Sequence, residues 1–350
     1  MDADYLIAGQ GICGTLLSRE LMMAGKTVIV VDDRSVSSSL AAGGIINPVT
    51  GKRLVRSWMI EELQSFAWDT YTTFGRELGT TIIQHSDILD FYATREMADI
   101  FTAKLDEEKE YLSTIDDGGW SQYFRFNYGI GKIAPCMLVD IRTMLSTWRQ
   151  YLQNKGALLE ETLNITDCVV TKEQVTYKNI KAGKLIFCDG AACATNPFFK
   201  KLPWSKDKGE ALLVSIPGLP RCNIFKQGTI SIVPWQDDLF WVGAAHDWKY
   251  VDLSPTAAFR RRVEEQFDYW LKIPYKVIDH IVALRPANMD RRPFVGLHPL
   301  YPAVGILNGM GGKGCAMAPY FADNFAQHLL HGTTLLPDVD IKRFTRMLSR

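Results

Sequence analysis

The apolar and polar positions of the N-terminal segment predict two strands with a helix between them. Residues 4–9 form a short apolar run that ends in glycine, which is typical of a buried strand. From residue 13 to 24 apolar side chains recur at helical spacing, and Gly25 ends the segment. Residues 27–31 are β-branched without polar alternation, as expected of a parallel strand covered on both faces. We therefore expect a βαβ unit with a right-handed crossover.

The rest of the chain continues this alternation around a β-rich insert. Residues 37–53 are small and Gly-rich, which predicts a loop. Apolar spacing predicts helices over 58–80, 92–115, 136–156, 255–271 and 315–331. Short apolar runs predict strands over 165–170, 173–177, 184–188, 209–216, 228–233, 239–245 and 303–308. Because βα signals occur at both ends and in the middle, the predicted fold class is α/β.

The composition is that of a globular protein without bulk charge. Of 350 residues, 47% are hydrophobic, and 39 basic residues balance 39 acidic ones. A neutral chain has no general attraction to nucleic acid or to an anionic membrane, so we expect neither as a partner. No apolar run approaches the length of a membrane span, and the first residues do not resemble a secretory signal.

The cysteines and histidines suggest no metal and no disulfide framework. The seven cysteines are scattered without a CxxC pair, and the six histidines lack metal-ligand spacing. The simplest interpretation is a protein without a metal site in a reducing, cytoplasmic compartment.

A G-x-G-x-x-G motif occupies the turn between the first predicted strand and helix. Gly9 would make the tight turn, Gly11 would let the backbone approach a pyrophosphate, and Gly14 would allow close helix–strand packing. Ile12 and Cys13 would begin the helix, whose amide groups and dipole favour an anion. A glycine turn without a ligand is the alternative.

Asp32 ends the second predicted strand at a spacing typical of dinucleotide-binding proteins. It follows Gly14 by 18 residues, where a carboxylate can accept hydrogen bonds from ribose hydroxyls. An acid at this place would repel the 2′-phosphate of NADP. Capping of the strand is the alternative role.

A second glycine cluster lies between the last predicted strand and the last helix. It consists of Gly309, Gly311, Gly312, Lys313 and Gly314. This loop would bring a second helix N-terminus and bare backbone to a cofactor held by distant residues. An isoalloxazine ring needs amides around its N1–O2 edge, whereas NAD does not, so the cluster favours FAD. An ordinary loop at a helix start is the alternative.

These features, in this order, resemble the D-amino-acid oxidase family of flavoenzymes, which includes glycine oxidase and sarcosine oxidase-like enzymes. The resemblance rests on the Gly9–Gly14 motif with Asp32, the small-residue loop 37–48, and the glycine loop 309–314. It rests also on Ala283-Leu284-Arg285-Pro286 with Asp290 and Pro293-Phe294-Val295-Gly296. Residues 55–135 and 200–280 match only in outline.

The resemblance implies FAD and a chain divided into two interleaved domains. A Rossmann-type FAD-binding domain would combine residues 1–54, 136–202 and 284–350. An α+β substrate domain built on an antiparallel sheet would combine residues 55–135 and 203–283.

The resemblance also implies cofactor contacts beyond the glycine motifs. Asp33, Arg34, Ser38 and Ser39 would lie near the ribose and pyrophosphate, and Gly43, Gly44 and Ile45 near the flavin. Val169 and Val170 would meet the adenine through backbone groups. Trp235, Trp241, His246, Trp248 and Tyr250 are candidates, by region only, for closing over the substrate, with core packing as the alternative.

Arg285 and Lys313 are the two candidate catalytic residues. In the family the arginine of the Arg-Pro segment binds the substrate carboxylate, and a guanidinium fork suits a planar carboxylate. The alternative for Arg285 is a domain-joining arginine paired with Asp290. Lys313 stands where a neutral residue is expected. It would place positive charge beside the pyrimidine edge of the flavin, or else lie on the surface.

The expected activity is oxidation of a C–N bond in a small amine or amino acid by hydride transfer to FAD. Oxygen or another electron acceptor would reoxidise the flavin. One alternative is an oxidase acting on a carboxymethylaminomethyl-modified tRNA base, with basic patches at Lys200, Lys201, Lys206, Lys208 and Arg260-Arg261-Arg262. The other is a non-catalytic FAD-binding protein. The neutral charge weighs against the first and Arg285 against the second.

Overall fold

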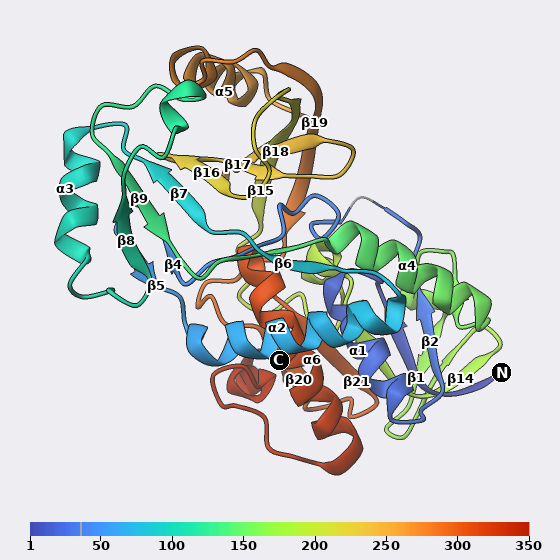
Figure 1. Cartoon of the computed structure of the whole chain (residues 1–350). Helices are drawn as coiled ribbons and strands as arrows, with labels where there is room; N and C mark the ends of the chain where they lie inside the picture. Colours follow the sequence, from blue (N-terminus) through green and yellow to red (C-terminus); the bar gives the residue numbers. More distant parts are fainter. Residues whose placement is uncertain (36, 350) are drawn as a thin grey trace.

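The computed structural model describes residues 1–35 and 37–349 (Figure 1). Its first sheet is built on four parallel strands, in the order β2 (Val28–Val31), β1 (Asp2–Ala8), β14 (Ile180–Phe187) and β21 (Val304–Asn308). The strands at its margins are β11 (Leu158–Leu159), β12 (Cys168–Val170), β13 (Val175–Tyr177) and β20 (Phe294–Leu297). The predicted N-terminal βαβ unit is confirmed.

Helices cover one face of this sheet because their apolar stripes share a core with it. They are α1 (Ile12–Met23), α2 (Ile60–Leu78), α4 (Ile141–Asn154) and α6 (Gly314–His331). Ile7 and Val30 of the sheet belong to the same buried cluster as Leu16, Tyr71 and Phe321 of these helices. The opposite face packs against Phe199, Leu202 and the short C-terminal helix α7 (Thr345–Leu348).

The second sheet has eight strands and is largely antiparallel. Their order is β19 (Lys276–Arg285), β15 (Asp207–Ser215), β18 (Leu239–Gly243), β17 (Ile230–Pro234), β16 (Ile224–Gln227), β7 (Ile88–Phe91), β9 (Ile130–Ile133) and β8 (Leu112–Ile115). Only the β7–β16 pair is parallel among the pairings within this sheet's described strands. Helix α5 (Ala257–Trp270) packs on one face, and α3 (Arg95–Lys104) packs near the other. Figure 1 shows the two sheets at opposite ends of the molecule, with α2 and α6 beside the first.

Small elements complete the fold. A three-stranded sheet joins β3 (Ile45–Ile46), β10 (Met137–Val139) and β6 (Ile83–His85), and a hairpin joins β4 (Val49–Thr50) and β5 (Val55–Arg56). Short 3₁₀ turns span Trp120–Gln122, Ile165–Asp167, Gly190–Thr195, Gly311–Lys313 and Ile341–Phe344. No helix in the described residues is both long enough and apolar enough to cross a bilayer.

Two predicted helices are wrong in part. The range 92–115 contains α3 only up to Lys104, and Leu112–Ile115 instead forms β8, because it pairs with β9. The range 136–156 begins with β10, and α4 starts after Asp140, whose side chain accepts a hydrogen bond from the Thr143 backbone amide. Local periodicity misses both, because strand pairing and capping decide these ends.

The α/β fold with a second, antiparallel-rich sheet is confirmed, while the domain boundaries stay a prediction. Helix α2 lies within residues 55–135, the range predicted for the substrate domain, and packs on the first sheet. Helix α2 buries Tyr71 and Phe74 in the core of the first sheet, and the Tyr71 hydroxyl donates to the Cys315 carbonyl of α6 at 2.9 Å.

Candidate active site

A cavity of about 1200 Å³ lies at the carboxyl ends of the first sheet's parallel strands and extends to β15 and β19 of the second sheet. Crevices at this edge of α/β sheets are the usual ligand sites. The sequence-predicted residues that line it are Gly9, Gly11, Ile12, Cys13, Asp32, Asp33, Arg34, Ser38, Ser39, Gly43, Gly44, Ile45, Gly311, Gly312, Gly314 and Arg285.

The turn between β1 and α1 leaves room for an anion at the helix start. Gly9 has φ +94°, a conformation that favours glycine. A Cβ on Gly14 would overlap the Gly9 carbonyl oxygen, so Gly14 serves helix–strand packing and does not line the cavity. A Cβ on Gly11 would meet only Ser39 Oγ, at 3.2 Å, and would otherwise project into free space. The cradle therefore fits a pyrophosphate.

Ser39 links the small-residue loop to this helix start. Its hydroxyl accepts a hydrogen bond from the backbone amide of Ile12 at 3.0 Å. The first turn of α1 contains no acidic side chain, so nothing there opposes an anion.

Asp32 is held by a buried arginine that the sequence analysis did not single out. Arg149 Nη1 donates to Asp32 Oδ1 at 2.7 Å and to Gln10 Oε1 at 3.0 Å. The backbone amide of Gln10 donates to Asp32 Oδ2 at 2.8 Å. The Arg149 side chain is only 7% exposed and lines the cavity. A charged residue between Leu145 and Leu152 on the apolar face of a predicted helix was the available signal.

Besides Gly14, four of the residues predicted for the cofactor site do not line the cavity. Val169 and Val170 lie on β12, where Val169 is 65% exposed. Residues 161–163 line that end of the cavity instead. Gly309 packs against Asn288 and Phe294, and its φ of +78° explains the glycine. Lys313 is the fourth.

Lys313 turns its ammonium toward the 47–57 loop. Nζ donates to Ser57 Oγ at 3.0 Å and to Asn47 Oδ1 at 3.3 Å. Burial lowers the pKa of Lys313 to about 8. The residue immediately precedes α6, whose N-terminus faces the cavity through Gly314 and Cys315.

Asp189, at the end of β14, is a cavity residue that the sequence analysis did not identify. Its Oδ1 accepts a hydrogen bond from Asn308 Nδ2 at 3.4 Å. Burial raises the pKa of Asp189 to about 7. This carboxyl therefore adds less negative charge beside the glycine turn at neutral pH than an exposed one would.

Arg285 reaches the cavity from the end of β19. Nη1 donates to Asp207 Oδ2 at 2.6 Å and to the Ala245 carbonyl at 3.0 Å. Within residues 1–35 and 37–349, Nε and Nη2 make no hydrogen bond. The alternative pairing with Asp290 is wrong, because Asp290 lies 3.3 Å from Arg343 Nη2 and the strand register sets Asp207 opposite Arg285.

Two candidate aromatic residues from the second sheet also line the cavity. Trp241 donates its indole N–H to the Ala41 carbonyl at 2.9 Å and leaves no room for a Cβ on Gly43. His246 Nδ1 lies 2.6 Å from Asp207 Oδ2. Although burial alone would raise it, the hydrogen bonds and positive charges of His246 and Arg285 lower the pKa of Asp207.

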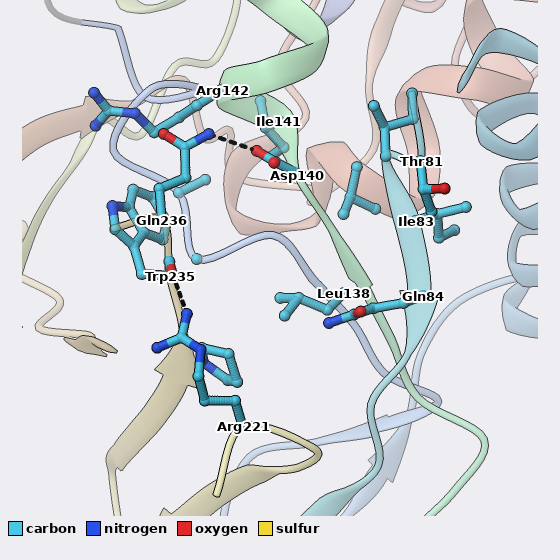
Figure 2. Close-up of a pocket in the computed structure, with 15 residues that line it drawn as sticks. Thr81, Ile83, Gln84, Leu138, Asp140, Ile141, Arg142, Arg221, Trp235 and Gln236 are labelled. Carbon is cyan, nitrogen blue, oxygen red and sulfur yellow. Dashed lines mark hydrogen bonds between the residues drawn. The ribbon is translucent and has the colours of Figure 1, made fainter. Parts of the chain in front are cut away.

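A second cavity, of about 340 Å³, adjoins the first and shares Ala42, Gly43 and Ile141 with it. Figure 2 shows Gln236 reaching toward Asp140 at the start of α4. Gln236 Nε2 donates to Asp140 Oδ1 and to Thr143 Oγ1, both at 3.0 Å. The hairpin between β17 and β18 is thereby tied to the first sheet's helices.

A βαβ anion cradle with a ribose-side carboxylate defines a dinucleotide-binding protein. The guanidinium of Arg285, which β19 brings to the same cavity from a separate sheet, carries a positive charge that can attract an anion. A dinucleotide cradle and a guanidinium in one cavity are compatible with an oxidoreductase.

Comparisons with known proteins specify the family. The family model DAO, described as FAD dependent oxidoreductase, matches residues 4–328. Glycine oxidase of Pseudomonas aeruginosa is 23% identical over 341 residues, covering 91% of this chain and 92% of its own. The chain belongs to the DAO family of FAD-dependent oxidoreductases, and its cofactor is FAD.

Solved structures agree on the fold. Glycine oxidase from Geobacillus kaustophilus superposes with a TM-score of 0.79 at 15% identity, covering 98% of both chains. Iminodiacetate oxidase from Chelativorans sp. BNC1 gives 0.77 at 19% identity, covering 97% of this chain and 98% of its own. L-proline dehydrogenase from P. horikoshii gives 0.76 at 17% identity, covering 99% and 98%.

Proposed function

We propose that the protein oxidises the C–N bond of a small amino acid that carries a free carboxylate. The observation that carries this proposal is Arg285. Its guanidinium lines the cavity with Nε and Nη2 unbonded among the described residues, while Nη1 is fixed by Asp207. Because Asp207 fixes one side of the guanidinium, its other edge is preorganised to bind a carboxylate through two hydrogen bonds.

The names of the similar proteins support this substrate class. Glycine, iminodiacetate and L-proline each carry an amino group on a carbon next to a carboxylate. A carboxylate on Arg285 would present that carbon to the cofactor. Bound FAD would accept the hydride from it.

The chain offers a distinct group for each part of FAD. We assign the pyrophosphate to the amides at the start of α1 near Gly11, and the ribose to Asp32. Residues 161–163 replace Val169 and Val170 as the proposed adenine contacts. The loop 311–314 would meet the flavin edge.

We assign Lys313 an electrostatic role. Its ammonium does not line the cavity, but it lies at the positive end of the α6 dipole. The charge would stabilise electron density on the pyrimidine side of the flavin. Bonds to Asn47 and Ser57 hold it in place.

Two of the lysines proposed for an RNA-binding patch lie in places that do not suit it. Lys208, one of the proposed basic residues, is 2% exposed, and its Nζ donates to the Ser254 carbonyl at 2.6 Å. Lys206 lines the cavity. Lys206 and Lys208 are therefore not part of an exposed basic surface for a nucleic-acid backbone.

The test is the visible spectrum of the FAD-bound protein under anaerobic conditions. We expect bleaching of the oxidised flavin when one of glycine, sarcosine, proline, iminodiacetate or a D-amino acid is added. The matching amines without a carboxylate should bleach it far more slowly. A flavin that stays oxidised with every amino acid would contradict the proposal.

A further inference from the structure

His246 and Asp207 form a hydrogen-bonded pair in the wall of the large cavity. His246 Nδ1 lies 2.6 Å from Asp207 Oδ2, and the Asp247 backbone amide donates to Asp207 Oδ1 at 3.0 Å. The Asp207 side chain is 5% exposed, whereas the His246 side chain is 53% exposed. The carboxylate is thus fixed from several sides while the imidazole borders the space available to a substrate.

The pair determines which nitrogen of His246 carries hydrogen. A carboxylate oxygen only accepts, so the short contact places the hydrogen on Nδ1. Arg285 Nη1 lies 3.1 Å from the same nitrogen, but it is also a donor and makes no hydrogen bond to a protonated Nδ1. In the neutral ring Nε2 therefore keeps its lone pair. Nε2 has no hydrogen-bond partner in residues 1–35 and 37–349.

A bound substrate carboxylate would change the balance of charge around His246. Asp207 faces the ring from β15, Arg285 from β19, and the Trp248 indole stacks on it at 5.7 Å between ring centroids. Asp207 is a single negative charge beside two groups that can be positive. A substrate carboxylate on Arg285 would supply the second negative charge next to the imidazole.

We propose that His246 is the base that removes a proton from the substrate ammonium, and that Asp207 is its positioning residue. The N–H bond of the ammonium breaks and an Nε2–H bond forms. The electron pair of the broken bond stays on the amine nitrogen as a lone pair, which loss of hydride from the adjacent carbon requires. The half-exposed ring returns the proton to water. This inference rests on the proposed function.

The test is the pH dependence of anaerobic flavin reduction by the amino acid that bleaches the wild-type holoenzyme. The variants are His246→Gln, Asp207→Asn and, as a matched control, His331→Gln. His331 is exposed at the end of α6 and does not line the cavity. FAD content and thermal unfolding of each variant check that it folds.

We expect His246→Gln to reduce flavin about 100-fold more slowly at neutral pH, the lower end for loss of a general base. Its rate should recover as the pH rises through the ionisation of the substrate ammonium, because the amine then arrives neutral. Asp207→Asn should slow flavin reduction less, with the same dependence on pH. It should also raise KM, because Asp207 holds the Arg285 guanidinium. His331→Gln should match the wild type.

Two results would overturn the inference while leaving the proposed function intact. One is a His246→Gln profile parallel to that of the wild type at every pH. The other is a defect that is largest at low pH and absent near neutrality, which would mean that an imidazolium binds an anion instead. A wild-type flavin that no amino acid bleaches at any pH would remove both the proposed function and the inference.

Discussion

The guanidinium of Arg285 lies directly against the backbone of Gly209. A Cβ on Gly209 would come within 2.5 Å of Arg285 Cζ, so only glycine lets the side chain lie flat over β15. The two residues are on neighbouring strands, and Asp207, two positions before Gly209, holds the same guanidinium through Nη1. The orientation of the Arg285 guanidinium is therefore set by β15 and not by β19 alone.

Gly209→Ala should displace the Arg285 guanidinium without unfolding the protein. The clash is with the far end of a flexible side chain, which can swing away at small cost to stability. We expect KM for the carboxylate substrate to rise about 10-fold, equivalent to about 1.4 kcal/mol, with FAD content unchanged. Steady-state kinetics and the flavin absorbance of the purified variant measure both. An unchanged KM would show that packing against Gly209 does not determine the position of the Arg285 guanidinium.

Arg285→Ala should lower kcat/KM for amino acids by about 100-fold or more, because the substrate carboxylate then lies in the cavity without its positive partner. Arg285→Lys restores the charge but not the fork and should recover only part of the loss. Arg291→Ala is the matched control, since Arg291 is a nearby exposed arginine that does not line the cavity. Equal kinetics for Arg285→Ala and Arg291→Ala would sink the carboxylate assignment.

The glycines of the first turn should separate cofactor binding from folding. Gly11→Val projects into the cradle, so we expect loss of FAD with little change in the unfolding of the FAD-free protein. Gly14→Ala collides with the Gly9 carbonyl, so it should destabilise that protein by about 2 kcal/mol or more. Denaturant titration and bound-flavin absorbance separate the two effects. The same outcome for both variants would contradict the division of roles.

Arg149→Met should weaken FAD binding by about 10- to 100-fold, because it leaves the buried side of Asp32 without its cation. Fluorescence titration of the FAD-free protein measures the affinity. Arg142→Met on the same helix serves as the control, since Arg142 lies near Trp235 and lines only the second cavity. If both variants bind FAD equally well, Arg149 does not position the ribose-side carboxylate.

Lys313 should make stability depend on pH in the alkaline range. Its pKa falls from 10.5 to about 8, so the unfolded chain binds more protons between these values. Wild-type stability should therefore rise from about pH 8 to pH 10.5 relative to Lys313→Met, which lacks the buried charge. Below pH 8 the variant should be more stable, by roughly 3 kcal/mol at most.

Thermal unfolding of both proteins over this pH range measures the Lys313 effect. Lys342→Met is the control, because the Lys342 side chain is 64% exposed. A pH-independent difference between wild type and Lys313→Met would contradict the buried charge.

The sequence alone determined the N-terminal βαβ unit, the FAD cofactor and the family. Each depends on motifs that are recognisable within single short stretches, although the family needed several such stretches along the chain. A strand covered on both faces needs an uninterrupted apolar run, and a pyrophosphate cradle needs glycine at Gly9, Gly11 and Gly14. The same local logic failed at residues 112–115, because pairing with β9 outweighed helical spacing.

Only the tertiary structure decided which charged groups meet. Asp207 and not Asp290 holds Arg285, because the register of β15 against β19 sets Asp207 and Arg285 opposite each other. Arg149 reaches Asp32 across 117 positions of sequence, and His246 reaches Asp207 across 39. Periodicity fixes which face a side chain takes but not its partner from a distant segment, since packing of whole elements sets that distance.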